Sequence, residues 1–179
     1  MKWMTLALSC ALAACNATNP KPPRATASSI GAPRADFSKY QTFSFGPANP
    51  PMTGYETTTR ALEVQRRLTP LVEAQLQKRG YSENADHADL VIKLTTGTGV
   101  ELGDKTQHGN PAEATATGFI GIDAYDGETG TAVWHGFAYA EIDPEQISDG
   151  LLARGVQHML SDFPARQDRA SKEPQAYAQ

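Results

Sequence analysis

The sequence feature that most constrains the fold is the stretch at residues 119–139, FIGIDAYDGETGTAVWHGFAY, in which two alternating segments flank a turn. In the first segment Ile120 and Ile122 alternate with Gly121 and Asp123, which is the period-2 pattern of a β-strand with two unlike faces. The second segment, after the turn, alternates in the same way. The stretch therefore predicts a β-hairpin around which the rest of the domain packs.

The turn determines which residues face each other across this hairpin. If a three-residue loop ends at Gly130, this glycine takes the left-handed conformation that closes the loop. That register places Trp134 opposite Ala124 on the apolar face, where Trp134 is expected to be a core anchor. It also places Asp123 opposite His135 on the other face. A shift by one residue would exchange the two faces.

The N-terminal residues 1–14 carry a short positive end and an apolar run, and Cys15 follows them. The residues Leu-Ala-Ala-Cys at 12–15 resemble a lipobox, the site at which bacterial lipoprotein precursors are cut and the new N-terminal cysteine is acylated. We therefore expect residues 1–14 to be a lipoprotein signal peptide and Cys15 to be the lipid attachment site, with palmitate among its acyl chains. The alternative is an ordinary secretory signal that is cut near Ala14.

Removing residues 1–14 leaves 15 basic and 20 acidic residues, a net charge of −5, and one cysteine, which carries the lipid. An intradomain disulfide and a thiolate metal site are therefore excluded. Residues 16–35 are rich in Pro, Ala, Thr and Ser and carry three basic residues and no acid, which predicts a flexible tether. The residues after the tether have a net charge of −8, which argues against nucleic acid as a partner.

The predicted location is the outer membrane, with the domain facing the periplasm. Asn16 follows the acylated cysteine at the position where Asp would signal inner-membrane retention in many Gram-negative bacteria. The basic residues of the tether lie next to the lipid, where anionic head groups attract them weakly. The predicted partners are therefore the membrane, through the lipid anchor, and a protein of the envelope.

Two more strands and two helices are predicted in the folded part, residues 36–164. One strand covers residues 40–45, and the next covers residues 88–96, whose alternating leucines and isoleucine would face the core. The polar, glycine-rich residues 97–118 form either extensions of two strands or a surface loop, and their composition favours disorder. Residues 165–179 form a polar C-terminal tail.

The first predicted helix covers residues 57–79 and carries an apolar stripe along one side. Pro70 interrupts it, so that one kinked helix or two short helices can form, the second of them capped by Thr69. The last helix is predicted to have Asp143 as its N-cap, with a capping box in its first turn, and to end before Pro164.

The predicted order of elements is β-α-β-β-β-α. This order favours an α+β fold in which two helices pack on one face of a four-stranded, mostly antiparallel sheet, because that arrangement buries the apolar stripes of both helices. The other face of the sheet is then more exposed to solvent, and it is called the wetter face below. The length of the folded part fits a single domain.

Five segments resemble a bacterial lipoprotein family, the one named domain of unknown function 4136. They are DFSKYQTFSFGP at 36–47, LQKRGY at 76–81, ADLVIKL at 88–94, GFIGIDAYDGETGTAVWHG at 118–136 and GVQHMLSDFP at 155–164. In this order and spacing they span nearly the whole folded part. The resemblance implies a periplasm-facing lipoprotein of this fold, and it brings no established reaction and no catalytic residue.

The sequence contains no H-E-x-x-H, phosphate-binding loop or G-x-S-x-G motif, so no cofactor, metal ion or catalytic residue is predicted. Asp126 is typical of turn chemistry. The Asp123–His135 pair is the sharpest chemical candidate, because a carboxylate orients an imidazole and raises its basicity, as a general base requires. Catalysis would also require a nucleophile or a metal ion, and the sequence shows no residue for either role. A cross-strand structural pair is therefore the favoured interpretation.

Two classes of function follow from these observations. The favoured one is a non-enzymatic docking or assembly module of the cell envelope, whose interaction surface is formed by Tyr125, Phe137 and Tyr139 on the wetter face. A tail or loop that covers these aromatic residues is the alternative reading of that face. The second class is a small hydrolase or ligand-binding domain that uses the face of Asp123 and His135.

Overall fold

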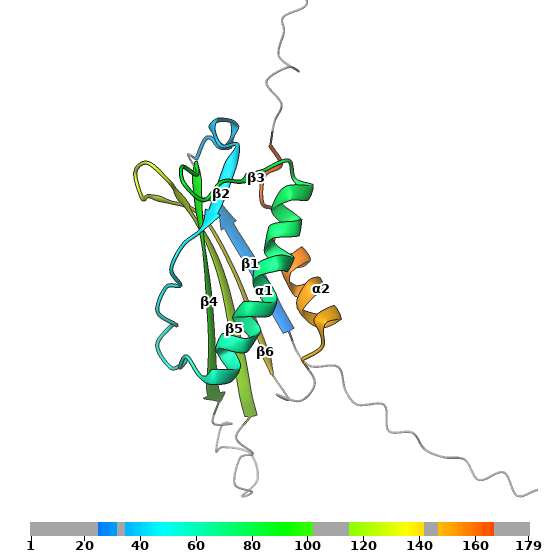
Figure 1. Cartoon of the computed structure of the whole chain (residues 1–179). Helices are drawn as coiled ribbons and strands as arrows, with labels where there is room; N and C mark the ends of the chain where they lie inside the picture. The colour runs from blue at the N-terminus through cyan, green and yellow to red at the C-terminus, as the bar shows by residue number, and fades with distance from the viewer. Residues whose placement is uncertain (1–24, 32–34, 102–114, 142–146, 167–179) are drawn as a thin grey trace, which may run out of the picture.

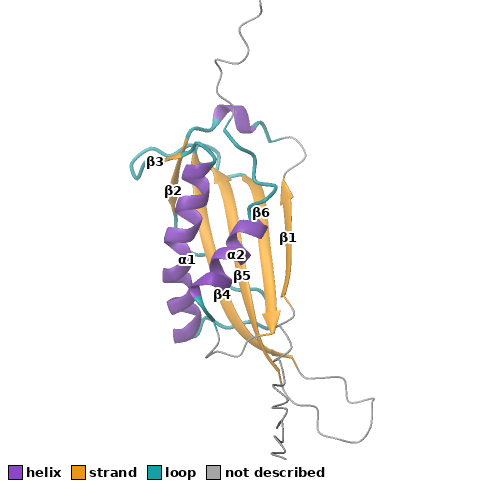
Figure 2. Ribbon diagram, turned by 90° about the vertical axis from the view of Figure 1, so that its right-hand side faces the viewer, coloured by secondary structure: helices purple, strands orange, loops and turns teal. Residues whose placement is uncertain are grey.

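The computed structural model describes residues 25–31, 35–101, 115–141 and 147–166, and in it two α-helices lie on one face of a six-stranded sheet (Figure 1, Figure 2). The strands are β1 (Ala25–Gly31), β2 (Thr42–Phe45), β3 (Ser82–Glu83), β4 (Leu90–Glu101), β5 (Thr115–Asp126) and β6 (Ala132–Glu141). The helices are α1 (Thr59–Lys78), α2 (Asp149–Met159) and the short 3-10 helix η1 (Phe37–Lys39). The face that the helices cover is called the inner face below, and the opposite one the outer face.

The strand order across the sheet is β1-β6-β5-β4-β2-β3. From β1 to β4 the neighbours are antiparallel, whereas β2 pairs in parallel with both β4 and β3. The α+β class is thus confirmed, but the prediction of a four-stranded, mostly antiparallel sheet is wrong, because the sheet has six strands and is mixed. The parallel pairing follows from α1, since a helix between β2 and β4 returns the chain to the end at which β2 began.

Two strands were not predicted from the sequence: the two-residue β3, and β1, which lies within residues 16–35, predicted as a flexible tether. All of β1 pairs with β6, from Ala25 opposite Ala140 to the end of the strand. Its side chains are small except for Ile30, which is exposed, so they bury little apolar surface, and the backbone hydrogen bonds to β6 contribute much of its stability. The tether prediction is therefore wrong for residues 25–31, whereas residues 16–24 and 32–34 lie outside the described part.

The ends of β4 and β5 occupy much of the glycine-rich stretch 97–118. β4 continues to Glu101 and β5 begins at Thr115, and they pair along this whole length. Of the two alternatives for the stretch, the extension of two strands is therefore confirmed for residues 97–101 and 115–118. Residues 102–114 between them lie outside the described part.

The first helix is continuous, which decides between the two predicted possibilities. α1 runs through Pro70 without a break, and Thr58 caps it by accepting a hydrogen bond from the Ala61 backbone N–H at 3.2 Å. Proline removes the N–H that would bond to the carbonyl of Arg66. Pro70 and Arg66 are both exposed, so water can satisfy that carbonyl and the helix does not need to end.

The second helix begins later than predicted. Ser148 is its N-cap and accepts from the Leu151 backbone N–H at 3.2 Å, whereas the predicted cap, Asp143, lies outside the described residues. Arg67 of α1 holds this end of α2 by donating to Asp149 Oδ1 through Nε at 2.9 Å and Nη2 at 2.6 Å. This contact between distant segments fixes the start of α2, and local spacing could not show it.

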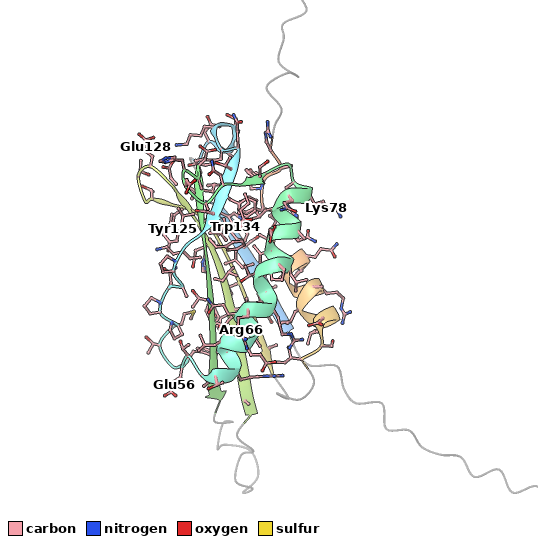
Figure 3. The ribbon with its side chains drawn as sticks, viewed as in Figure 1. Glu56, Arg66, Lys78, Tyr125, Glu128 and Trp134 are labelled. Atoms are coloured by element: carbon pink, nitrogen blue, oxygen red, sulfur yellow. The ribbon has the colours of Figure 1, made fainter. Side chains whose placement is uncertain are left out.

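The core lies between the inner face and the two helices, and Trp134 is buried within it. Its indole ring packs edge to face against Phe163, with centroids 5.1 Å apart. Gly136 makes room for this ring, because a Cβ there would lie 2.3 Å from it. In Figure 3 Trp134 lies on the helix side of the sheet and Tyr125 on the other side, as the predicted alternation requires.

Candidate functional site

The hairpin of β5 and β6 has the predicted register, with Ala124 opposite Trp134 and Asp123 opposite His135. Gly130 adopts the predicted left-handed conformation, with φ of 68°. On the outer face the Nδ1 atom of His135 lies 2.5 Å from Asp123 Oδ1. The carboxylate therefore fixes the orientation of the imidazole ring, which leaves Nε2 as the ring atom that can face other groups.

The second oxygen of Asp123 is also engaged, by a residue that the sequence did not single out. Asn49 Nδ2 donates to Asp123 Oδ2 and to the Tyr125 hydroxyl, both at 2.9 Å. The ammonium group of Lys93 lies over the Tyr125 ring, 4.6 Å from its centroid. Among the described residues no hydroxyl nucleophile bonds to the His135 ring, so the pair is a cross-strand contact tied to a loop.

Asn49 belongs to the segment between β2 and α1, which runs down the outer side of the sheet (Figure 1). Farther along it, the sulfur of Met52 accepts a hydrogen bond from the Tyr139 hydroxyl at 3.3 Å, and the Tyr55 ring packs on Phe119 with centroids 5.6 Å apart. This loop contacts two of the three predicted interface residues, Tyr125 and Tyr139. These two residues therefore contact a loop, as the alternative reading of this face expects, and they remain half-buried.

A sequence signal for this loop exists in β4. A Cβ at Gly97 would lie 2.9 Å from the Tyr55 Cβ, and one at Gly99 would lie 2.8 Å from the Gly54 carbonyl oxygen. Glycine at alternate positions of one strand face therefore permits another backbone to approach closely. The composition of residues 97–118 reflects this approach rather than disorder in its first five residues.

The uncovered part of the outer face centres on Phe137, the third predicted interface residue. Its ring lies 5.5 Å from that of His135 and 5.3 Å from that of Tyr139. Its direct neighbours on the two flanking strands are Ser28 and Gly121, which are too small to cover it. Phe137 is half-buried and stands free of the loop contacts described above.

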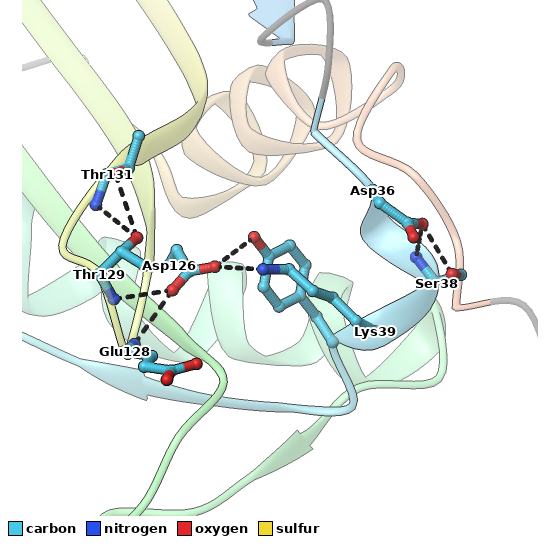
Figure 4. A network of polar contacts seen from close by, with 8 residues as sticks. Asp36, Ser38, Lys39, Asp126, Glu128, Thr129 and Thr131 are labelled. Atoms are coloured by element: carbon cyan, nitrogen blue, oxygen red, sulfur yellow. Dashed lines mark hydrogen bonds and ion pairs between the residues drawn. The ribbon is translucent and has the colours of Figure 1, made fainter.

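A polar cluster joins the hairpin turn to the start of β2 (Figure 4). Asp126 Oδ2 accepts from Lys39 Nζ at 2.6 Å and from the Tyr40 hydroxyl at 2.8 Å, while Oδ1 accepts from the backbone N–H groups of Glu128 and Thr129. The hydrogen bond from Lys39, followed by those from Thr129 and Tyr40, holds the pKa of Asp126 well below its ordinary value. Asp126 thus has the predicted turn role, and it also acts as a clamp between distant segments.

A cleft of about 730 Å³ lies at the opposite end of the sheet from this turn. It is formed by the N-terminal parts of α1 and α2 and by the far ends of β4, β5 and β6, and no sequence pattern indicated it. Figure 2 shows that α2 covers only the middle of the sheet, so that the lower ends of β4 and β5 extend past it. The lining includes the apolar residues Val64, Ile120, Ile147, Leu151 and Leu152.

The described residues contain no group of three or more His, Cys, Asp or Glu side chains that could hold a metal ion. No helix within these same ranges is long and apolar enough to cross a bilayer. Cys15, the predicted lipid attachment site, lies outside them. The arrangement as described offers two surfaces for recognition: the strip around Phe137 and the apolar cleft.

Among solved structures, the fold is similar to that of a PDZ domain protein from Parabacteroides distasonis, with a TM-score of 0.56 and 14% sequence identity. The match covers 82% of this chain, which spans only 37% of the length of that protein. The PelC dodecamer from Paraburkholderia phytofirmans matches in two crystal forms, with TM-scores of 0.48 and 0.43 at 14% and 15% identity, over 80% of this chain and 100% of PelC.

A comparison with curated proteins of known sequence gives no match. A family model does match, over residues 29–165, and it begins within β1 and extends past α2. This range takes in the hairpin, the Asp126 cluster and both helices. The chain therefore belongs to the family described as Domain of unknown function (DUF4136).

Proposed function

We propose that this member of the DUF4136 family is a lipid-anchored, non-enzymatic docking module of the bacterial cell envelope. A protein partner in the periplasm binds the outer face of its sheet. The observation that carries this proposal is an exposed apolar strip that runs from that face onto the loop after β2.

The strip consists of Ile30, Phe137 and Met52. Ile30 is 62% exposed and Met52 is 46% exposed, while Phe137 lies between small neighbours on both sides. Large apolar side chains that gather on one exposed face are typical of protein interaction sites, and aromatic residues often contribute most of the binding energy there. The Asp123–His135 pair lies at the edge of the strip and adds a polar rim.

The position of β1 supports an anchored function. Only nine residues, 16–24, separate Cys15 from Ala25, the first residue of the sheet. A chain of this length spans at most about 35 Å from Cα to Cα. An acyl group on Cys15 would therefore keep the domain close to the membrane surface, where an envelope partner would meet it.

Site-specific photocrosslinking in cells tests the docking face. A photoreactive amino acid at Ile30 or Phe137 should form crosslinks to one defined protein. The matched control is Leu62 on α1, which is 50% exposed but lies away from the outer face. Equal crosslinking from Leu62, or none from the other two positions, would contradict the proposal. The double replacement of Ile30 and Phe137 by Ser should weaken capture of the same protein.

Two further variants separate the remaining parts of the proposal. His135→Ala should leave capture nearly unchanged, because its ring belongs to the rim. A loss of cellular function from His135→Ala, at normal expression and stability, would instead support chemistry at the Asp123–His135 pair. Cys15→Ala should move the protein from the membrane fraction to the soluble fraction or leave its precursor uncut, and a variant that is cut normally and still fractionates with the membrane would rule out the anchor.

A further inference from the structure

We propose that the cleft between the helix N-termini and the far end of the sheet binds one acyl chain of a membrane lipid. The membrane as the source of this chain rests on the lipid anchor proposed above. The cleft itself, and its preference for an alkyl chain, rest on the described residues alone.

The first argument is the shape and chemistry of the cleft. Its volume of about 730 Å³ lies within the range of roughly 300–1,000 Å³ that small-molecule sites occupy. Small residues create this space where larger ones would close it, namely Ala61, Ala116, Gly118, Ala138, Ala140 and Gly155. A Cβ at Gly155 would meet no atom within 4 Å, so the space over this part of α2 is open.

The second argument is that polar groups of the lining already have partners within the protein. Thr96 Oγ1 donates to the Ala61 carbonyl oxygen at 2.8 Å, and the Thr98 hydroxyl donates to the Thr58 hydroxyl at 3.2 Å. A polar metabolite buried here would find the protons of these two hydroxyls already engaged and would lack those donors. An alkyl chain needs none.

The third argument concerns charge at the cleft. The charged lining residues in the described part are Glu56 and Arg60, and the guanidinium Nη1 of Arg60 lies 2.7 Å from Glu63 Oε2. The described lining thus carries one charge of each sign, and its cation is already paired with Glu63, so the cleft presents no unpaired cation to an anionic head group. We infer that the ligand is selected by its chain, and that its head group stays in solvent.

The fourth argument is the place of the cleft relative to the anchor. Ala140 lines the cleft and is also the partner of Ala25 in the sheet. The folded chain therefore begins beside the cleft, and the nine residues that lead back to Cys15 bring this end of the molecule, rather than the hairpin turn, toward the membrane. An acyl chain of a neighbouring lipid is then the apolar chain that the cleft meets at the highest concentration.

Binding is tested with the full chain carrying Cys15→Ala, which has no acyl group of its own. Titration with cis-parinaric acid, a fluorescent fatty acid, should show saturable binding at one site. Lysophosphatidylcholine and palmitate, both below their micelle-forming concentrations, should displace it with similar potency, because their head groups stay in solvent and the cleft does not contact them. Absence of saturable binding, or displacement by only one of the two lipids, would overturn the assignment.

Gly155→Phe should weaken this binding at least tenfold, since its side chain would occupy the open space. Gly150→Phe is the matched control on the same helix, because Gly150 does not line the cleft, and it should bind within twofold of the parent chain. If Gly155→Phe fails to fold, as judged by circular dichroism, Ala140→Phe on β6 provides the same test. Unchanged binding in folded cleft variants would contradict the proposal.

The source of the chain is tested with lipidated protein reconstituted into vesicles that contain phosphatidylcholine with a diazirine in one acyl chain. Irradiation should label cleft peptides, and Gly155→Phe should reduce the label while Gly150→Phe does not. If the unlipidated chain binds cis-parinaric acid but the lipidated protein takes no label in the cleft, the protein's own acyl group fills the site and the assignment to a neighbouring lipid is wrong. A failed anchor would show in the fractionation of Cys15→Ala and would leave the titration result intact.

Discussion

Replacement of Asp126 should reveal how strongly the hairpin turn is clamped to the start of β2. Its side chain is only 6% exposed and accepts four hydrogen bonds, at 2.6 Å from Lys39, 2.8 Å from Tyr40, 2.9 Å from the Thr129 N–H and 3.1 Å from the Glu128 N–H. We consider Asp126→Ala, which removes every acceptor, and Asp126→Asn, which keeps an acceptor for the turn and removes the charge.

The magnitude follows from what each donor does when the carboxylate is gone. The Tyr40 hydroxyl is buried and would lose its partner, which costs about 1–3 kcal/mol, in addition to the loss of a charge-assisted bond. Lys39 is 51% exposed and returns to water, so its ion pair adds little. Glu128 and Thr129 are exposed turn residues, so water can replace much of what their part-buried N–H groups lose. We therefore expect Asp126→Ala to lower the free energy of unfolding by about 2–4 kcal/mol, and Asp126→Asn by about half as much.

The pH dependence gives a second, independent readout. The pKa of Asp126 is lowered in the folded state, so its ionised form adds stability above the ordinary aspartate pKa of about 3.9. That stability is lost as the pH falls through the folded-state pKa. The difference between the parent chain and Asp126→Asn should therefore be constant between about pH 5 and about pH 8 and should shrink below about pH 4.

Urea unfolding followed by tryptophan fluorescence measures both effects. Lys39→Ala serves as the control for the exposed partner and should change the midpoint much less than Asp126→Ala. If Asp126→Ala and Lys39→Ala had equal effects, the clamp would not depend on the buried carboxylate. A difference between the parent chain and Asp126→Asn that persisted unchanged at low pH would refute the electrostatic part of the reasoning.

Three other outcomes are expected. Trp134→Ala should lower the free energy of unfolding by about 3–5 kcal/mol in urea titrations, and Trp134→Phe by clearly less, because the buried indole N–H has no partner among the described residues. Gly127→Ala should lower the melting temperature, since its Cβ would lie 2.1 Å from the Ala88 carbonyl oxygen, and an unchanged melting temperature would contradict that packing. Limited proteolysis of the mature chain should cut within residues 16–24, as read by mass spectrometry, whereas a stable fragment that begins near Asp36 would mean that β1 is not held in the sheet.

The candidate site was only partly accessible from the sequence. The alternation of β5 and β6 placed Asp123 beside His135 and Tyr125, Phe137 and Tyr139 on one face, because directly opposed residues in a register share a face. The partners of these residues were not accessible, since Asn49 and Met52 come from a loop without periodicity. Their contacts depend on the path of the loop across the sheet, which local sequence does not encode.

The fold, too, was predicted from the sequence in some features and not in others. The sequence by itself determined the hairpin register, the burial of Trp134 and the α+β class, because apolar periodicity specifies which side of each element is buried. Tertiary structure alone decided that the polar β1 becomes a strand, since its stability comes from backbone pairing with β6, and that β2 runs parallel to β4, since α1 carries the chain back. Tertiary structure alone also creates the cleft, because small residues from separate strands and helices leave a common space. No single segment of the sequence contains that information.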